Sequence, residues 1–320
     1  MISRLGKAFI ALLMAAPCAA LANDFPNRPV TIVVPYSAGG STDVAARIVG
    51  EGLSKQLAQP VIIDNKPGAG GTIGTMAVKN APADGYTLLI TSASHIVNNI
   101  LQPELTYNIE EDFVPLSQIT QLPIVLVVNK DSQIKSLPDL IAAAKKSPGA
   151  LNFGTAGIGT IQHVSAMQLL DKADIDATHV AYKGGAAALT DLIGGQIDFT
   201  FSPIVEVLSY IESGRVRPLA VTTTERSAAL PAVPTLAESV PGYDSFHWNG
   251  FVVRKGTPAE NVAKLSDALV KATKDPAVIA KLKSQGTDAK GEGAQALADL
   301  MKAEKDRLTP LLSPAVAASK

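Results

Sequence analysis

Cysteine and histidine are both scarce in this chain. Its single cysteine, Cys18, lies near the N-terminus of the 320 residues, so a disulfide framework and a thiolate metal site are excluded. The four histidines lack the spacing typical of metal ligands, and the motif H-E-x-x-H is absent. They are His95, His163, His179 and His247. We therefore expect neither a metal nor a cofactor.

An excess of charge of either sign is also missing. The chain has 28 Lys and Arg against 29 Asp and Glu, which gives a formal net charge of −1. This balance gives no electrostatic footprint for nucleic acid or for an anionic membrane, so we expect neither as a partner. An acidic ligand would have to be held by local groups, because the protein has no general positive field.

The motifs of common enzymes are absent as well. Neither G-x-S-x-G nor G-x-x-x-x-G-K-[ST] occurs, and Gly157-x-Gly159 fails the dinucleotide fingerprint because Gln162 stands where its third glycine belongs. Residues 132–135 match S-x-x-K, but S-D-N and K-T-G are missing, so we interpret the match as chance. With no nucleophile–base pair visible, we expect no catalytic residue and no enzyme.

The first 22 residues have the features of a secretory signal peptide. Arg4 and Lys7 precede an apolar stretch over residues 8–16, and residues 20–22 (Ala-Leu-Ala) fit the small-residue cleavage motif. Cleavage after these residues predicts a mature protein of the periplasm.

Two alternatives to a cleaved signal peptide are a membrane anchor and a lipoprotein. The apolar stretch is shorter than the about 20 residues that a membrane helix needs, which disfavours an anchor. Lipidation at Cys18 is disfavoured because Pro17 stands where a small residue is expected.

Short β-rich runs alternate with helical stretches along the rest of the chain, which predicts α/β layers with mainly parallel strands. A unit of strand, glycine-rich loop and helix occurs over residues 30–57, with its helix expected over residues 41–57, and again over 151–170. We interpret the two units as two lobes that point helix N-termini at a shared cleft. We expect the chain to cross between lobes near residues 121–124 and 222–235. The lobes are expected to comprise residues 23–122 with 230–320, and residues 123–229.

Four loops rich in glycine and hydroxyl side chains follow predicted strands. Glycine lets backbone N–H groups approach a ligand closely, and a helix N-terminus adds unpaired donors with a partial positive charge. These features predict an anion site that needs no arginine. The alternative is ordinary turns with Ser or Thr caps, which any one loop alone would favour, whereas four loops in both halves favour a site. The loops cover residues 36–43, 68–72, 91–95 and 154–160.

Three polar side chains near these loops have more than one interpretation. Asp43 complements the dipole of its helix, contacts an amine or hydroxyl of the ligand, or locks the loop. His163 donates either to a ligand or to a neighbouring carbonyl. Lys183 either pairs with a carboxylate across the cleft or is a solvated lysine before a helix.

Short motifs follow one another in a fixed order along the chain after residue 22. They are Val34-Pro35-Tyr36 with Gly39-Gly40-x-x-Asp43-x-x-Ala46-Arg47, Asn65-Lys66-Pro67-Gly68-Ala69-Gly70-Gly71, Ala83-Asp84-Gly85-Tyr86-Thr87-Leu88, Asn152-Phe153-Gly154 with Gly157-x-Gly159-Thr160-x-x-His163, Tyr182-Lys183-Gly184, Asp191-Leu192-Ile193-Gly194-Gly195-Gln196-Ile197-Asp198, Val233-Pro234-Thr235, Pro241-Gly242-Tyr243 and Trp248-x-Gly250. In this order the motifs resemble those of the Bug, or TctC-like, family of extracytoplasmic solute receptors.

The resemblance implies a two-lobed α/β fold, the type II periplasmic-binding-protein or Venus flytrap fold, with mixed sheets flanked by helices. It implies that a carboxylate sits between the lobes, held by backbone amides, hydroxyls and ordered water. TctA/TctB-like membrane subunits of a tripartite tricarboxylate transporter would then recognise the closed receptor, which we expect to be a monomer. The residues expected at the ligand are Tyr36, Ser37, Gly39, Gly40, Ser41, Thr42, Asp43, Thr72, Ser92, Ser94, Thr155, Gly159, Thr160, His163, Lys183 and Asp198.

The resemblance leaves the ligand open. Family members bind dicarboxylates, tricarboxylates, amino acids or aromatic acids, and residues 199–203 depart from the usual pattern in a segment that lines the cleft of this fold. A receptor that delivers a carboxylate to a transporter is therefore the main hypothesis. The alternatives are a sensor that presents the ligand to a membrane histidine kinase, and a periplasmic enzyme.

Overall fold

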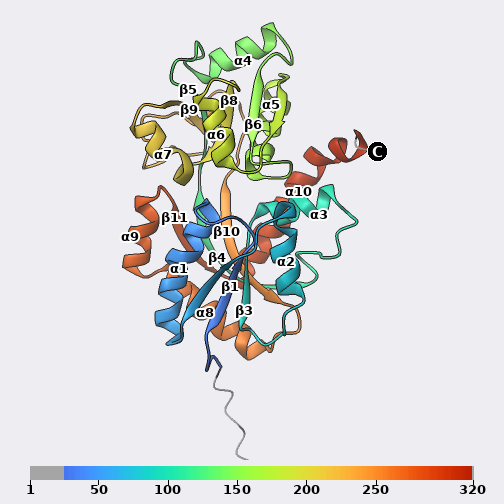
Figure 1. Ribbon diagram of the computed structural model, residues 1–320, viewed down its shortest axis with the longest axis vertical. Helices are drawn as coiled ribbons and strands as arrows, with labels where there is room; N and C mark the ends of the chain where they lie inside the picture. Colours follow the sequence, from blue (N-terminus) through green and yellow to red (C-terminus); the bar gives the residue numbers. More distant parts are fainter. Residues whose placement is uncertain (1–24, 319–320) are drawn as a thin grey trace, which may run out of the picture.

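The computed structural model describes residues 25–318, with side chains up to residue 312. The predicted signal peptide, residues 1–22, lies outside the described residues. The chain forms two lobes, one above the other in Figure 1, and each lobe is built on one mixed sheet flanked by helices. No helix within the described range combines the length and the apolar character needed to cross a bilayer.

Lobe 1 carries a six-stranded sheet in the order β11-β4-β10-β3-β1-β2. Its strands are β1 Val30–Val34, β2 Val61–Asn65, β3 Thr87–Thr91, β4 Phe113–Leu122, β10 His247–Arg254 and β11 Asp288–Gly293. Its helices are α1 Ser41–Leu57, α2 Thr72–Lys79, α3 Ala93–Leu101, α8 Ala259–Thr273, α9 Pro276–Ser284 and α10 Ala294–Ala318. Helices cover both faces of this sheet, so successive residues of a strand enter different cores. Ile32 packs in the core with α1 and α8, and Val33 packs with Trp248 and Leu297 in the other core.

Lobe 2 carries a five-stranded sheet in the order β7-β6-β8-β5-β9. Its strands are β5 Ile124–Asn129, β6 Asn152–Thr155, β7 Thr178–Ala181, β8 Phe199–Pro203 and β9 Val216–Val221. Its helices are α4 Leu137–Lys146, α5 Ile161–Ala173, α6 Gly185–Ile193 and α7 Ile204–Glu212. The expectation of mainly parallel strands is wrong, because β10 and β5 each run antiparallel to both of their neighbours.

The chain passes from lobe 1 to lobe 2 at Pro123, where β4 continues directly into β5. The return lies between β9 and β10, and most of this segment packs on lobe 2. Leu236, Val240 and Tyr243 belong to the core around β5 and β8. We therefore propose that lobe 2 extends to about Tyr243, beyond the limit of 229 expected from the sequence.

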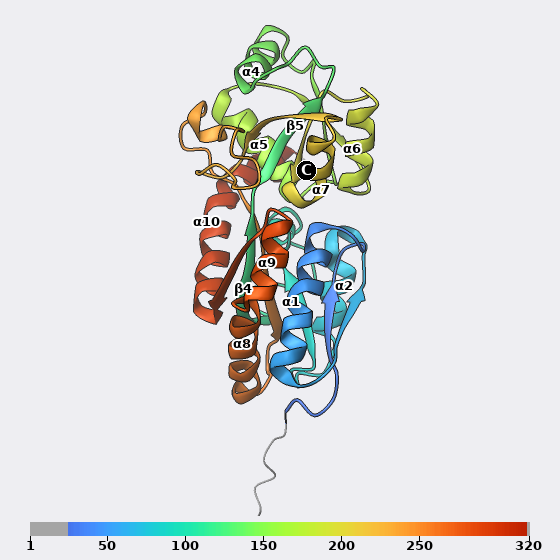
Figure 2. The ribbon, with the colours of Figure 1, turned by 90° about the vertical axis from the view of Figure 1, so that its left-hand side faces the viewer.

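Helix α10 also connects the lobes. In Figure 2 it runs along lobe 1 and its end reaches lobe 2. Leu308 and Leu312 of α10 pack with Val97 of α3 and Val164 of α5 in one small core. The helix thus joins the two lobes by an apolar contact outside the strand connections.

The strand directions bring the carboxyl ends of both sheets to the junction between the lobes. Ile124, the first residue of β5, pairs with Pro203 at the end of antiparallel β8, and β6 runs parallel to β8. In lobe 1, His247 at the start of β10 pairs with Leu122 at the end of antiparallel β4, and β3, which is also antiparallel to β10, runs parallel to β1. Strand β2 runs parallel to β1, so the loops after β1, β2, β3, β6, β7 and β8 lie at the junction, where ligands bind in open α/β sheets.

Candidate functional site

The first glycine loop is held by the carboxylate of Asp43, in the first turn of α1. One oxygen, Oδ2, accepts hydrogen bonds from the backbone N–H of Gly39 at 2.9 Å and from Arg47 Nε at 3.0 Å. The other, Oδ1, accepts a hydrogen bond from Asn65 Nδ2 at 2.9 Å, and the same amide nitrogen donates to the carbonyl of Tyr36. Asp43 therefore fixes the course of the loop that leads from Tyr36 into α1.

The electrostatics of Asp43 agree with this structural role. Its side chain is only 3% exposed. Burial alone would raise the pKa of Asp43, but hydrogen bonds from Arg47, Gly39 and Asn65 outweigh burial and hold the pKa below its usual value. The carboxylate therefore stays charged and holds the loop through its bonds to Gly39, Arg47 and Asn65. Of the interpretations of Asp43, the geometry favours a loop lock.

Beside this loop, three buried polar atoms have no hydrogen-bond partner among the described residues. They are Tyr36 Oη after β1, Ser92 Oγ after β3, and Nε2 of His95 in the first turn of α3. Burial lowers the pKa of His95 to about 4, so its ring is neutral at pH 7. Buried polar groups normally have partners, so unpaired ones on neighbouring loops indicate a place where a ligand or water binds.

In lobe 2 the loop after β6 is held by its own side chains. Thr155 Oγ1 accepts a hydrogen bond from the N–H of Gly157 and lies 2.7 Å from His179 Nε2. Nδ1 of His163 accepts a hydrogen bond from the N–H of Gly159 at 3.4 Å. Burial, together with the neighbouring His179, lowers the pKa of His163 to about 4. His163 is therefore a neutral acceptor for its own loop, a role that neither sequence interpretation included.

Thr160 is the N-cap of α5. Its Oγ1 accepts from the N–H of His163 at 3.5 Å and donates to the carbonyl of Gly157 at 2.7 Å. We expect Thr160→Ala to lower the free energy of unfolding by about 1 kcal/mol, measured by urea denaturation, because the cap is lost. Thr190→Ala, which removes a mid-helix hydroxyl, should change stability much less. A loss of ligand affinity without loss of stability would instead place the Thr160 hydroxyl at the ligand.

The two lobes contact each other around this region. Gly159, with φ +80°, packs so closely on α3 that a β-carbon would lie 3.2 Å from Asn98 Oδ1 and 3.3 Å from Val97 Cγ1. The backbone N–H of Ser41 at the start of α1 donates to Oε1 of Glu206 in α7, at 3.4 Å. Loops from both lobes therefore meet at one junction.

The structure brings most of the expected residues to this junction. The exception is Asp198, which precedes β8 and therefore lies at the far end of the strand. Its Oδ2 accepts from the N–H of Asn152 at the start of β6, so its role is structural and we leave it out of the proposed site. Lys183 lies at the junction but is exposed. Those at the junction are Tyr36, Ser37, Gly39, Gly40, Ser41, Thr42, Asp43, Thr72, Ser92, Ser94, Thr155, Gly159, Thr160, His163 and Lys183.

Two further polar residues at the junction were not expected from the sequence. Glu206 lies in the first turn of α7, and Oε1 of Gln162, in the first turn of α5, accepts from the N–H of Ala156. A β-carbon on Gly185 would lie 2.7 Å from both Glu206 Oε2 and Gln162 Nε2, so the two side chains converge on the start of α6. Pro203, which ends β8, is the one sequence signal near Glu206, but the apolar residues on both sides of it hide the start of the helix.

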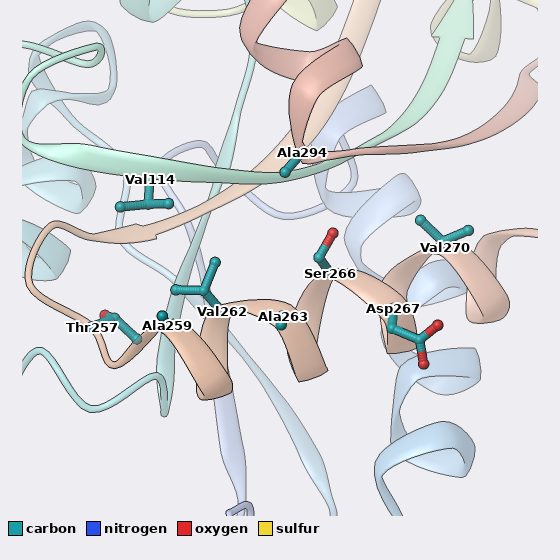
Figure 3. A pocket seen from close by; sticks show the side chains of 9 residues that line it. All are labelled: Val114, Thr257, Ala259, Val262, Ala263, Ser266, Asp267, Val270 and Ala294. Carbon is teal, nitrogen blue, oxygen red and sulfur yellow. The ribbon is translucent and has the colours of Figure 1, made fainter.

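A separate hollow of about 600 Å³ lies on lobe 1 between β4 and α8 (Figure 3). Val114, Val262 and Val270 make much of its wall apolar, and Asp267 stands at its edge. None of the glycine loops contributes to its lining, so this hollow does not form part of the candidate site.

Comparisons with known proteins agree on one family. A family model described as "Tripartite tricarboxylate transporter family receptor" matches residues 45–315. Protein BugT of Bordetella pertussis is 38% identical over 278 residues, which cover 85% of this chain and 84% of BugT. MatC from Rhodopseudomonas palustris with bound malate is 32% identical, with a TM-score of 0.83, and the match covers 90% of this chain and 100% of MatC. An R. palustris protein with adipate is 33% identical, with a TM-score of 0.85. This match covers 90% of this chain and 97% of the R. palustris protein.

Proposed function

The chain belongs to the tripartite tricarboxylate transporter receptor family, whose members are substrate-binding receptors and not enzymes, and from this we propose that it captures a small carboxylate between its two lobes. The observation that carries the proposal is the meeting of strand ends from both sheets at the junction between the lobes, where the ligand cleft would lie. The N-termini of α1 and α3 approach it from lobe 1, and those of α5 and α6 approach it from lobe 2.

The chemistry of this cleft suits a carboxylate. Helix N-termini carry unpaired N–H donors and a partial positive charge, so they bind anions without a basic side chain. Each hydrogen bond to a charged group contributes about 1.5–3 kcal/mol. Four or five of them would support micromolar affinity, about −8 kcal/mol, after the cost of ordering the ligand. Malate and adipate, bound by two similar proteins, are both dicarboxylates, which supports this ligand class.

The family also supports proposals for location and partners. We propose that residues 1–22 are removed on export, and that the mature chain acts as a monomer in the periplasm. Closure of the lobes around the ligand would present a surface to TctA/TctB-like subunits of the membrane transporter. Of the alternatives, a sensor shares the same ligand chemistry, and no feature of the described residues favours it.

A thermal-shift screen of residues 23–320 tests the proposal. A ligand at 100 times its dissociation constant adds about 2.7 kcal/mol to the stability of the folded state, which a melting curve resolves. We expect stabilisation by a subset of mono-, di- and tricarboxylates, acidic amino acids or aromatic acids. Sugars and cationic amino acids serve as controls.

The outcomes separate clearly. Stabilisation by a subset of the carboxylates supports the receptor function and identifies the ligand class. No response to any carboxylate, with protein verified to be free of ligand, contradicts the proposal. Stabilisation by a sugar or a cationic control alone would show that the helix ends do not select an anion.

A further inference from the structure

Glu206 places a carboxylate of the protein inside the cleft where the ligand is proposed to bind. It extends from α7 of lobe 2, and its Oε1 accepts a hydrogen bond from the N–H of Ser41 in lobe 1 at 3.4 Å. Its Oε2 faces the start of α6, since a β-carbon on Gly185 would lie 2.7 Å away. The carboxylate thus lies between helix ends of both lobes.

No basic side chain neutralises this carboxylate among the described residues. Glu206 is absent from every ion pair described over residues 25–318. Lys183, the nearest basic residue along the chain to the start of α6, is exposed and takes part in none of them either. Burial raises the pKa of Glu206, as expected for a carboxyl group without a cation beside it.

This position changes what the cleft selects. The N–H of Ser41 is already used by a protein carboxylate, so a ligand carboxylate has to bind the donors that remain. A second carboxylate beside Glu206 would also be repelled in a partly desolvated cleft. An ammonium group on the ligand removes this conflict, because it donates to Glu206 and neutralises it while the ligand's carboxylate occupies other helix ends.

We propose that Glu206 binds an ammonium group of the ligand, so that the receptor prefers amino carboxylates to the same carboxylates without the amine. This inference rests on the proposed function, since it names the ligand class of the same cleft. It makes Glu206 a specificity residue. Gly185 contributes by leaving room for the Glu206 side chain, since a β-carbon there would displace it.

Matched ligand pairs test the inference by isothermal titration calorimetry. The pairs are aspartate with succinate, glutamate with glutarate, and alanine with propionate. We expect the wild-type protein to bind the amino member of at least one pair at least tenfold more tightly. Glu206→Gln, which keeps the shape but removes the charge, should reduce that preference below threefold. Glu212→Gln, on the exposed end of the same helix, should leave it unchanged.

Three results would overturn the inference. The first is a wild-type protein that binds the plain carboxylates as tightly as their amino partners, which leaves the receptor function standing. The second is a Glu206→Gln variant with an undiminished preference, checked for folding by its melting curve. The third is a variant that binds both members of a pair more tightly, because Glu206 would then compete with the ligand's carboxylate. If no carboxylate of any kind binds, the proposed function fails together with this inference.

Discussion

Replacing Asp43 with alanine should lower the free energy of unfolding by about 2–3 kcal/mol and weaken ligand binding more than tenfold. The buried carboxylate accepts hydrogen bonds from Gly39, Arg47 and Asn65, and hydrogen bonds to charged groups contribute about 1.5–3 kcal/mol each before the partners regain water. Binding should suffer as well, because these bonds fix the loop at the start of α1. Urea denaturation and calorimetry measure the two effects.

The control is Asp267→Ala on α8. Asp267 and Lys271 form an ion pair with the same i, i+4 spacing as Asp43 and Arg47, but both of their side chains are largely exposed. Exposed pairs of this kind contribute about 0.3–0.5 kcal/mol, so this variant should change neither stability nor binding appreciably. Equal losses in the two variants would contradict the loop-lock role of Asp43.

Acid should remove the contribution of Asp43 from the wild-type protein. Because the pKa of Asp43 is lower in the folded state, its stabilisation is fully present above the unfolded-state pKa of about 3.9. The stabilisation is lost as the pH falls through the lowered folded-state pKa. The free energy of unfolding of the wild type should therefore exceed that of Asp43→Ala by its largest amount at pH 7, and this difference should shrink below about pH 4. A difference that stays constant down to pH 3 would show that the charge of Asp43 is irrelevant.

Local signals in the sequence predicted the elements that point at the cleft. The helix expected over residues 41–57 has the same limits in the structure, because its apolar stripe is regular and an acid in the first turn complements the dipole. The first crossing was expected at residues 121–124 and lies at Pro123. The sites at Gly39 and Gly159 require positive φ, which glycine adopts without strain, so their loops were visible as glycine-rich runs.

Features set by tertiary packing were not visible in the sequence. Residues 199–211 are mostly apolar, and such runs do not distinguish a strand from a helix, so the change from β8 to α7 at Pro203 was missed. Glu206 was missed together with the helix that carries it. The segment around Leu236 and Tyr243 packs on lobe 2 only because distant strands form its partner surface, and no local pattern reports that.

Asp198 illustrates the limit of a motif. It occurs in a stretch shared with the family and was expected at the ligand, yet it lies just before β8, whose other end faces the junction between the lobes. Its hydrogen bond to the N–H of Asn152 joins the starts of two parallel strands. The motif identified the family correctly, whereas the direction of the strand decided the role of the residue.

Gly40→Val should reduce ligand affinity at least 100-fold, about 2.8 kcal/mol, while the protein still folds. Gly40 is the residue before α1, with φ −76° and ψ 167°, a conformation that valine also adopts. A β-carbon there would lie 3.7 Å from the carbonyl oxygen of Ser37 and 3.8 Å from Glu206 Oε1, which are ordinary contacts. The two γ-carbons would then extend into the cleft and block a ligand from the helix end.

Two further variants separate blocking from unfolding. Gly40→Ala adds only the β-carbon, for which the structure has room, so most of the affinity should remain. Gly293→Val adds the same side chain on β11, where a β-carbon meets nothing within 4 Å and φ is not positive, so binding should be unchanged. Because the backbone at Gly40 needs no glycine for its own conformation, we propose that glycine here allows a ligand to approach closely. Normal binding by Gly40→Val would therefore remove the start of α1 from the site.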